Sequence, residues 1–389
     1  MTRGPNAIDF WRGVALITIF INHIPGNWLE DFTHRNFGFS DSAELFVLLA
    51  GWSLRLSIGD NPGKESTPGL VVRLGGRAVT LYAAQVVITM IALAMIAATA
   101  IWLDNPLILD WSNAGAVFQT PIEAHIGLVL LSHQLGHFDI LPLYVVLLAI
   151  APGIALLDRF APRLLFPISF AIYLAALVFQ INAPTWPVAG YWYFNPFAWQ
   201  FLFVLGFLVA REAQPGRPLA RALPILRWPA LAFLLVSLWA WRTFTVPDPM
   251  LVPWPTYLFI IDKTYLTPLR LIHVLALCAG FVAVYSGIVR YTRWAARFGS
   301  MLGRNSLYVF CVGSLLSLAG QLIRVAFPVS MALDVIVVKS SQHFQAAFAP
   351  IAGDILYCDA LGPLSQDFAS FPYRRIGRPI WPLDSIDRF

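Results

Sequence analysis

The chain consists largely of apolar runs that are long enough to cross a lipid bilayer as helices. Of its 389 residues, 58% are hydrophobic and only 12% are charged, about half the charged share of an average soluble domain. Because about 20 apolar residues span the hydrocarbon core as a helix, the sequence predicts an all-α, polytopic membrane bundle. Nine transmembrane helices are predicted, with a weaker tenth at about residues 325–338, and the nine lie at about 7–24, 43–58, 79–103, 140–157, 164–181, 195–210, 229–246, 268–289 and 306–323.

The basic residues follow one side of the predicted membrane. If the N-terminus is cytoplasmic, the outer loops up to the ninth helix contain Arg35, Lys263 and little else. By the positive-inside rule this asymmetry predicts an N-in, multi-pass protein. The net charge of +5 therefore reflects topology rather than nucleic-acid binding. The inner loops would hold Lys64, Arg73, Arg77, Arg159, Arg163, Arg211, Arg217, Arg221, Arg227, Arg290, Arg293, Arg297 and Arg304.

One transmembrane domain is expected over residues 1–338, followed at 339–389 by a polar, proline-rich tail that is disordered or lies on the surface. His133 and His137 stand four residues apart, but no glutamate follows His133 as it does in zinc proteases. We therefore expect neither a metal nor a resident cofactor. The cysteines also form no disulfide framework or metal-binding spacing; they are Cys278, Cys311 and Cys358.

Three ionisable residues lie on one face of the first predicted helix. Asp9, Arg12 and His23 fall within roughly 60° of one another at 100° per residue. Each such group costs on the order of 3 kcal/mol to bury in hydrocarbon, so it is seldom present without a use. His23 is the member best suited to act as a general base. The alternative is that Asp9 and Arg12 pair or snorkel at the cytoplasmic end while His23 sits in the outer interface.

Two carboxylates, Asp41 and Glu44, open the second predicted helix at its outer end. Arg55 follows Glu44 by eleven residues and returns to nearly the same face. The structural alternative is a helix cap in which Glu44 completes a capping pattern with Asp41. A carboxylate near His23 would orient the ring and stabilise the imidazolium. Which of the two would be that partner stays open.

Arginines at both ends of the bundle are candidate anion-binding residues. Arg73 and Arg77 lie one turn apart at the cytoplasmic side and could converge on a phosphate, although plain topology or anionic lipid binding explains them equally well. Lys263, Arg270 and His273 lie on the outer side, where topology does not explain them. A buried Arg270 could hold a carboxylate, either of a substrate or of Glu44.

The run that opens the sixth predicted helix combines amide and aromatic side chains. Asn195 is a candidate helix cap, whereas Gln200 and Trp199 could contact a sugar by hydrogen bonding and ring stacking. Ordinary packing explains these residues at least as well.

Six motifs stand out along the chain, at residues 8–13 (IDFWRG), 21–27 (INHIPGN), 33–51 (THRNFGFSDSAELFVLLAG), 139–144 (DILPLY), 194–200 (FNPFAWQ) and 268–273 (PLRLIH). Together they resemble the OpgC family, whose members are inner-membrane enzymes that succinylate osmoregulated periplasmic glucans and are similar to the acyltransferase 3 family. The resemblance covers roughly residues 7–325. It implies that His23 acts in acyl transfer and that Arg73 and Arg77, spaced one residue wider than in acyltransferase 3 proteins, meet the acyl-CoA.

The sequence and the resemblance lead to one hypothesis about function. An acyl-CoA co-substrate, succinyl-CoA, would bind from the cytoplasm through a set of arginines and donate its acyl group to a periplasmic glucan in the bacterial inner membrane. The protein would have the lipid bilayer, the acyl-CoA and the glucan as partners, and no nucleic acid. The alternative is a transporter or flippase of an anionic or glycosyl substrate. The expected site comprises His23, Glu44 and Asp41 in catalysis, Arg12, Arg55, Arg73 and Arg77 at the donor, and Arg270, His273, Asn195 and Gln200 at the acyl group or acceptor.

Overall fold

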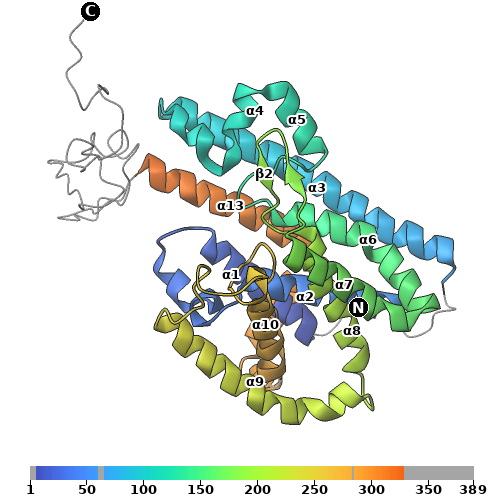
Figure 1. Ribbon diagram of the computed structural model, residues 1–389. Coiled ribbons are helices and arrows are strands. Elements are labelled where there is room, and N and C mark those ends of the chain that lie inside the picture. Colours follow the sequence, from blue (N-terminus) through green and yellow to red (C-terminus); the bar gives the residue numbers. More distant parts are fainter. Residues whose placement is uncertain (1–5, 60–64, 283, 328–389) are drawn as a thin grey trace, which may run out of the picture. The chain divides into compact units, whose positions relative to one another are not determined.

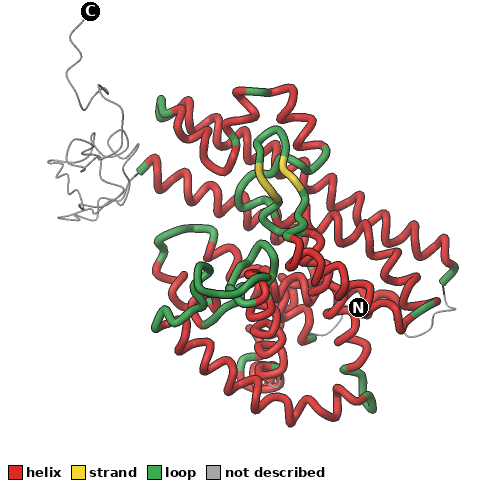
Figure 2. Tube along the Cα trace, in the orientation of Figure 1, coloured by secondary structure: helices red, strands yellow, loops and turns green. Residues whose placement is uncertain are grey.

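A computed structural model describes residues 6–59, 65–282 and 284–327. Lys64, Cys358, most of the weak tenth span and the expected tail at 339–389 lie outside the described residues. In the described part nearly all regular structure is helical, with a single small hairpin of two antiparallel strands (Figures 1 and 2). The prediction of an all-α bundle is confirmed for this part of the chain.

The helices and strands are labelled in Figure 1. Most of the long helices carry an apolar sequence, and the shorter ones lie in the connections. The strands β1 (Pro184–Thr185) and β2 (Gly190–Tyr191) form the hairpin between α7 and α8. The helices are α1 (Ala7–Asn22), α2 (Ser42–Ile58), α3 (Thr67–Trp102), α4 (Gly115–Gln119), α5 (Pro121–Val129), α6 (Ile140–Phe160), α7 (Pro162–Phe179), α8 (Pro196–Glu212), α9 (Pro218–Arg242), α10 (Pro268–Phe281), α11 (Val284–Tyr291), α12 (Arg293–Arg304) and α13 (Ser306–Ala326).

Each of the nine predicted spans coincides with a helix, but fewer of them meet the length and hydropathy expected of a membrane crossing. Five described helices do so: α3, α6, α7, α9 and α13. The pair α10 and α11, bent by 47°, makes a sixth if it is one span. The remaining three, α1, α2 and α8, have only 16, 17 and 17 residues. A membrane protein is therefore supported, while the count of nine to ten and the N-in orientation stay predictions.

The short helices α2 and α8 pack against each other in the interior of the bundle. Trp199, Phe203 and Phe207 of α8 have 0% exposed side chains, and Leu48 of α2 is 1% exposed. Helices enclosed by other helices need not match the bilayer thickness themselves, which explains their short length. They hold the N-terminal ends of α2 and α8 next to the candidate site.

Two helix starts differ from the prediction. The third helix begins at Thr67 rather than at 79, because Ser66 caps it and Pro68 follows in the first turn. The helix predicted to start at 229 begins at Pro218 and continues through Pro224 and Pro229. Hydropathy alone misses these starts because arginines lie in the opening turns, Arg73 and Arg77 in α3 and Arg221 and Arg227 in α9.

The amphipathic helix α12, predicted only as part of an inner loop, packs along α1. The two backbones touch at Gly13 and Gly303, where an added Cβ would overlap the facing main chain. Arg304 reaches Asp9, with Nε and Oδ2 separated by 3.3 Å. This ion pair agrees with the alternative in which Asp9 is paired near the start of α1.

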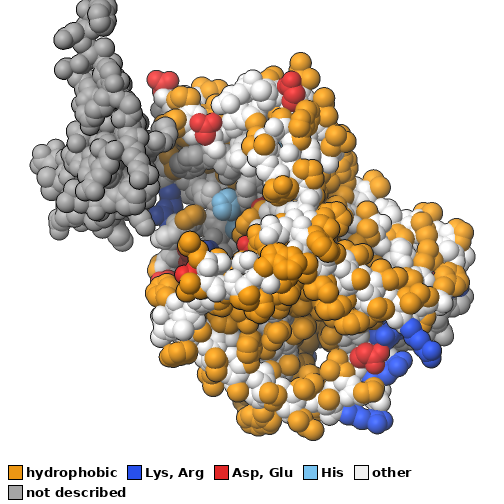
Figure 3. Space-filling view, in the orientation of Figure 1, with side chains coloured by type: hydrophobic (Ala, Val, Ile, Leu, Met, Phe, Trp, Pro, Cys, Tyr) orange, Lys and Arg blue, Asp and Glu red, His pale blue; other side chains and the backbone are white. Residues whose placement is uncertain are grey.

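The surface is apolar over most of the face drawn in Figure 3. Acidic side chains appear toward the end that carries α4 and α5, and a group of basic side chains lies near the α6–α7 and α8–α9 connections. A hydrophobic surface with charges at its ends is typical of a membrane protein.

Candidate functional site

A cavity of about 830 Å³ lies at the C-terminal end of α1. It is lined by the end of α1, the approach to α2, the turn before α6 and the loop before α10. We name it the His23 cavity, and its polar wall is the candidate site. The residues that define it are His23, Asp41, His137, Asp139, Lys263 and Arg270.

His23 is the C-cap residue of α1, and its backbone N–H donates to the carbonyl of Ile19 at 3.0 Å. Its carbonyl accepts a hydrogen bond from Gln321 of α13. The Nδ1 atom is shielded from solvent and has no hydrogen-bond partner among the described residues. The ring packs edge-on against His137, with centroids 4.9 Å apart. Burial, followed by the neighbouring His137 and Lys263, lowers the pKa of His23 to about 3, so the ring is neutral at pH 7.

The two carboxylates of α2 form the capping box that was the structural alternative. Asp41 Oδ1 accepts from the N–H of Ala43 at 2.8 Å, and Glu44 Oε2 accepts from the N–H of Asp41 at 3.0 Å. Neither carboxylate hydrogen-bonds to His23, contrary to the expected pairing. Their remaining oxygens are occupied by cations from a distant part of the chain, which is the physical reason.

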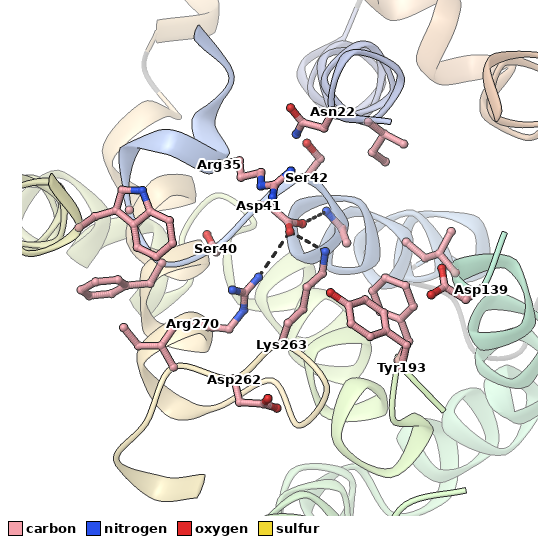
Figure 4. A pocket seen from close by; sticks show the side chains of 18 of the residues that line it. Asn22, Arg35, Ser40, Asp41, Ser42, Asp139, Tyr193, Asp262, Lys263 and Arg270 are labelled. Carbon is pink, nitrogen blue, oxygen red and sulfur yellow. Dashed lines mark hydrogen bonds and ion pairs between the residues drawn. The ribbon is translucent and has the colours of Figure 1, made fainter. Parts of the chain in front are cut away.

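Those cations are Lys263 and Arg270 (Figure 4). Lys263 Nζ lies 2.5 Å from Asp41 Oδ2, and Arg270 Nη2 lies 3.6 Å from the same oxygen. Arg270 Nε also donates at 2.7 Å to Glu44, whose side chain is 0% exposed. Burial opposes the charge on Asp41, but Lys263 and Arg270 outweigh it and hold the pKa of Asp41 well below its usual range. Of the two carboxylates considered for Arg270, that of a substrate or that of Glu44, the structure shows the contact with Glu44.

Asp139 is a cavity residue that sequence reasoning did not select. Figure 4 shows it beside Tyr193 and apart from the ion pairs of Asp41. Burial raises the pKa of Asp139 to about 6, although Lys263 acts in the opposite direction. His137 was considered only as a metal ligand, yet it contacts His23. Only their positions in the sequence could have identified these cavity residues. Asp139 stands at the outer end of the span predicted at 140–157, and Lys263 is a charge in an outer loop.

His273 lies behind the wall of this cavity and does not line it. Its Nδ1 atom is 2.7 Å from Ser40 Oγ, and its ring packs against Phe39 and Phe233. The Nε2 atom is buried without a hydrogen-bond partner among the described residues. Direct contact of His273 with an acyl group is therefore not supported by its position.

Asn195 and Gln200 also do not line the cavity. Asn195 caps α8 by accepting from the N–H of Phe197 at 3.0 Å and donates to Ile181 at 2.8 Å. Gln200 accepts from Ser169 Oγ at 2.7 Å and donates to the Ser169 carbonyl at 2.9 Å. Both amides are buried and hydrogen-bonded within the protein, as the packing alternative expects, and their contact with a sugar stays a prediction.

A second cavity, of about 360 Å³, is named the Arg12 cavity. Arg12 Nη2 lies 2.5 Å from Ser306 Oγ, and its guanidinium lies over the Phe46 ring at 5.9 Å. The hydroxyl of Tyr144 is buried and has no hydrogen-bond partner among the described residues. The polar residues that line the Arg12 cavity are Arg12, Ser53, Arg77, Thr80, Tyr144, Arg304 and Ser306.

Only two of the four expected donor arginines meet at this cavity. Arg77 and Arg12 line it, whereas Arg73 pairs with Glu65 through contacts of 3.0 and 2.7 Å. Arg55 donates to the carbonyl of Gly59 at 2.7 Å and does not line the cavity. Arg73, held by Glu65, does not share this cavity with Arg77, and the convergence of the two arginines on one anion stays a prediction.

The described residues contain no group of three His, Cys, Asp or Glu side chains arranged to hold a metal ion. His133 and His137 do not share a helix face, since they lie in the irregular segment before α6. His133 Nε2 donates to the carbonyl of Asn113 at 3.0 Å.

The family described as OpgC protein matches residues 5–352. No curated protein and no solved structure matches the chain.

Proposed function

The chain belongs to the OpgC family, and from that premise we propose that it is an O-acyltransferase of the bacterial inner membrane. It would move a succinyl group from cytoplasmic succinyl-CoA to a hydroxyl group of a periplasmic glucan. Family membership and the apolar helices support a membrane-bound transferase. The acyl donor, the acceptor and the orientation in the membrane are parts of the proposal.

The observation that carries the proposal is the state of His23. A neutral imidazole with an unpartnered Nδ1 sits at a large polar cavity. Such a ring can accept a proton from a hydroxyl group that enters the cavity. Asp41 favours the imidazolium electrostatically, but burial, His137 and Lys263 oppose it more strongly, so His23 would hold the proton only transiently and pass it on.

In the proposed transfer one carbon–oxygen bond forms and one carbon–sulfur bond breaks. The glucan hydroxyl oxygen bonds to the thioester carbonyl carbon while His23 takes the hydroxyl proton. The carbon–sulfur bond then breaks, and the proton passes from His23 to the CoA thiolate. The products are the glucan ester and free CoA thiol, and His23 returns to its neutral form.

Lys263 is the cation that we propose for the carboxylate of the succinyl group. Its ammonium group has three N–H donors, and the described contacts include one hydrogen bond, to Asp41. Arg270 is committed to buried Glu44 and serves as a positioning residue. His273 contacts Ser40 and would thereby fix the position of the loop that precedes α2.

The Arg12 cavity is proposed as the donor site. Arg12 and Arg77 would meet the anionic part of the acyl-CoA, because guanidinium groups suit phosphate oxygens. The Tyr144 hydroxyl is free to donate to a ligand oxygen. An N-in topology would place this cavity on the cytoplasmic side and the His23 cavity on the periplasmic side.

The test uses the purified full-length protein in detergent with succinyl-CoA and glucan. Release of CoA thiol and the mass of the glucan are measured for wild type, His23→Ala and the matched control His125→Ala, an exposed histidine of α5. His23→Ala is expected to lose activity about 10²- to 10⁴-fold. Glucan binding without CoA release by the wild type would instead support the transporter alternative.

A further inference from the structure

The two cavities meet at one side chain. Among the described residues that line them, Ile140 alone belongs to both walls. It is the first residue of α6 and is only 5% exposed. The His23 cavity and the Arg12 cavity are therefore separated at this point by the thickness of a single residue.

Neighbouring helices show that the partition is thin. On α2, Ala43 lines the His23 cavity and Phe46 lines the Arg12 cavity, a rise of about 4.5 Å. On α1 the corresponding residues are Ile19 and Arg12, about 10 Å apart along the axis. The cavities thus approach each other along three helices within one or two turns.

The partition is apolar and contains no ion pair among its described members. Phe46 and Tyr144 pack with ring centroids 5.2 Å apart, and Ile19 is 9% exposed. Ile140 occupies the first position of α6, where its own N–H has no intrahelical acceptor. A change of rotamer at Ile140 moves the side chain alone and breaks no backbone hydrogen bond.

We propose that the Ile140 side chain is the constriction through which the acyl group passes between the two cavities, and that its bulk limits the acyl length accepted. This inference rests on the proposed function, because it assigns the donor and acceptor to different cavities. A shorter side chain at 140 would join the cavities more widely and admit a longer dicarboxylic acyl group. A larger one would separate them.

Cysteine labelling tests the constriction without relying on activity. Ile140→Cys is introduced into the full chain after Cys278, Cys311 and Cys358 are replaced by alanine. A membrane-impermeant methanethiosulfonate is then applied to right-side-out and to inverted vesicles. We expect labelling from both sides at Ile140→Cys and none at the control Leu143→Cys, which is on the same helix, 0% exposed and lines neither cavity. Labelling from one side only, or from neither, would overturn the inference.

Acyl selectivity is the second readout. The ratio of kcat/KM for adipyl-CoA to that for succinyl-CoA is compared in wild type, Ile140→Ala, the milder Ile140→Val and the control Leu143→Ala. Ile140→Ala is expected to raise the ratio at least tenfold, since one methylene in a fitted site changes selectivity by about 10- to 200-fold. An unchanged ratio in both Ile140 variants contradicts the inference. Two-sided labelling without acyl transfer by the wild type would refute the proposed function but leave the constriction standing.

Discussion

The His23 cavity and the Arg12 cavity differ in how their charges are balanced. In the ion-pair network at the first, Lys263 and Arg270 contact Asp41 and Glu44, so that two cations are matched by two anions. In the second, three arginines and a buried tyrosine hydroxyl line the wall, and one of these arginines, Arg304, pairs with Asp9. A matched network fixes the shape of a site, whereas an excess of donors is arranged to receive an anion.

The largest expected effect comes from breaking the matched network. Arg270→Ala leaves Glu44 buried without its partner, which costs about 3–5 kcal/mol of stability. The midpoint of thermal unfolding in detergent should fall sharply. The double variant Arg270→Met with Glu44→Gln should recover much of the loss, because it removes both charges. A midpoint equal to that of the wild type for Arg270→Ala would contradict the account.

An intermediate effect is expected at the second cavity. Arg12→Ala should raise KM for acyl-CoA about 10- to 100-fold, since a hydrogen bond to a charged group contributes about 1.5–3 kcal/mol. Arg73→Ala is the matched control, because Arg73 pairs with Glu65 and does not line the cavity. If both variants raise KM equally, the donor site is not the Arg12 cavity.

A smaller effect is expected at Tyr144. Tyr144→Phe removes one neutral donor and should raise KM for acyl-CoA about 3- to 10-fold, in line with about 0.5–1.5 kcal/mol for a neutral hydrogen bond. Stability should not fall, because the hydroxyl has no partner in the described protein. Steady-state kinetics and a melting curve together check this prediction. A lower melting midpoint with unchanged KM would indicate a structural role instead.

The smallest effect concerns pH. The neutral form of His23 is the active form, and activity is lost only as pH falls through its folded pKa of about 3. At pH 5 only about one ring in a hundred would be protonated, so kcat/KM should change less than about twofold between pH 7 and 5. Asp139→Asn is the control, because the pKa of Asp139 is raised to about 6. A fall with an apparent pKa near 6.5 in both proteins would show an unperturbed histidine.

Hydropathy predicted the positions of the long helices well, because a lipid-facing helix has to be apolar along its length. It did not predict α12, whose small residues pack on α1 while Arg293 and Arg297 are exposed. Nor could it give the number of spans, since α1, α2 and α8 are apolar through burial in protein as well as through contact with lipid.

The candidate site was predicted in part. The cost of an imidazole at the end of an apolar helix identified His23, and the outer-side charges identified Arg270. The contact between Asp41 and Lys263 joins residues 222 apart in the chain, and no local pattern encodes such a pairing. Asn195 and Gln200 were assigned to the acceptor because the sequence does not reveal that their amides are buried and already hydrogen-bonded.

The most direct test of the central claim, that His23 accepts the proton in acyl transfer, is the succinyl content of periplasmic glucans measured by mass spectrometry. A null strain is complemented with wild type, His23→Ala or His125→Ala at equal membrane abundance. We predict succinylated glucans with wild type and His125→Ala and none with His23→Ala. Full succinylation by His23→Ala would contradict the account.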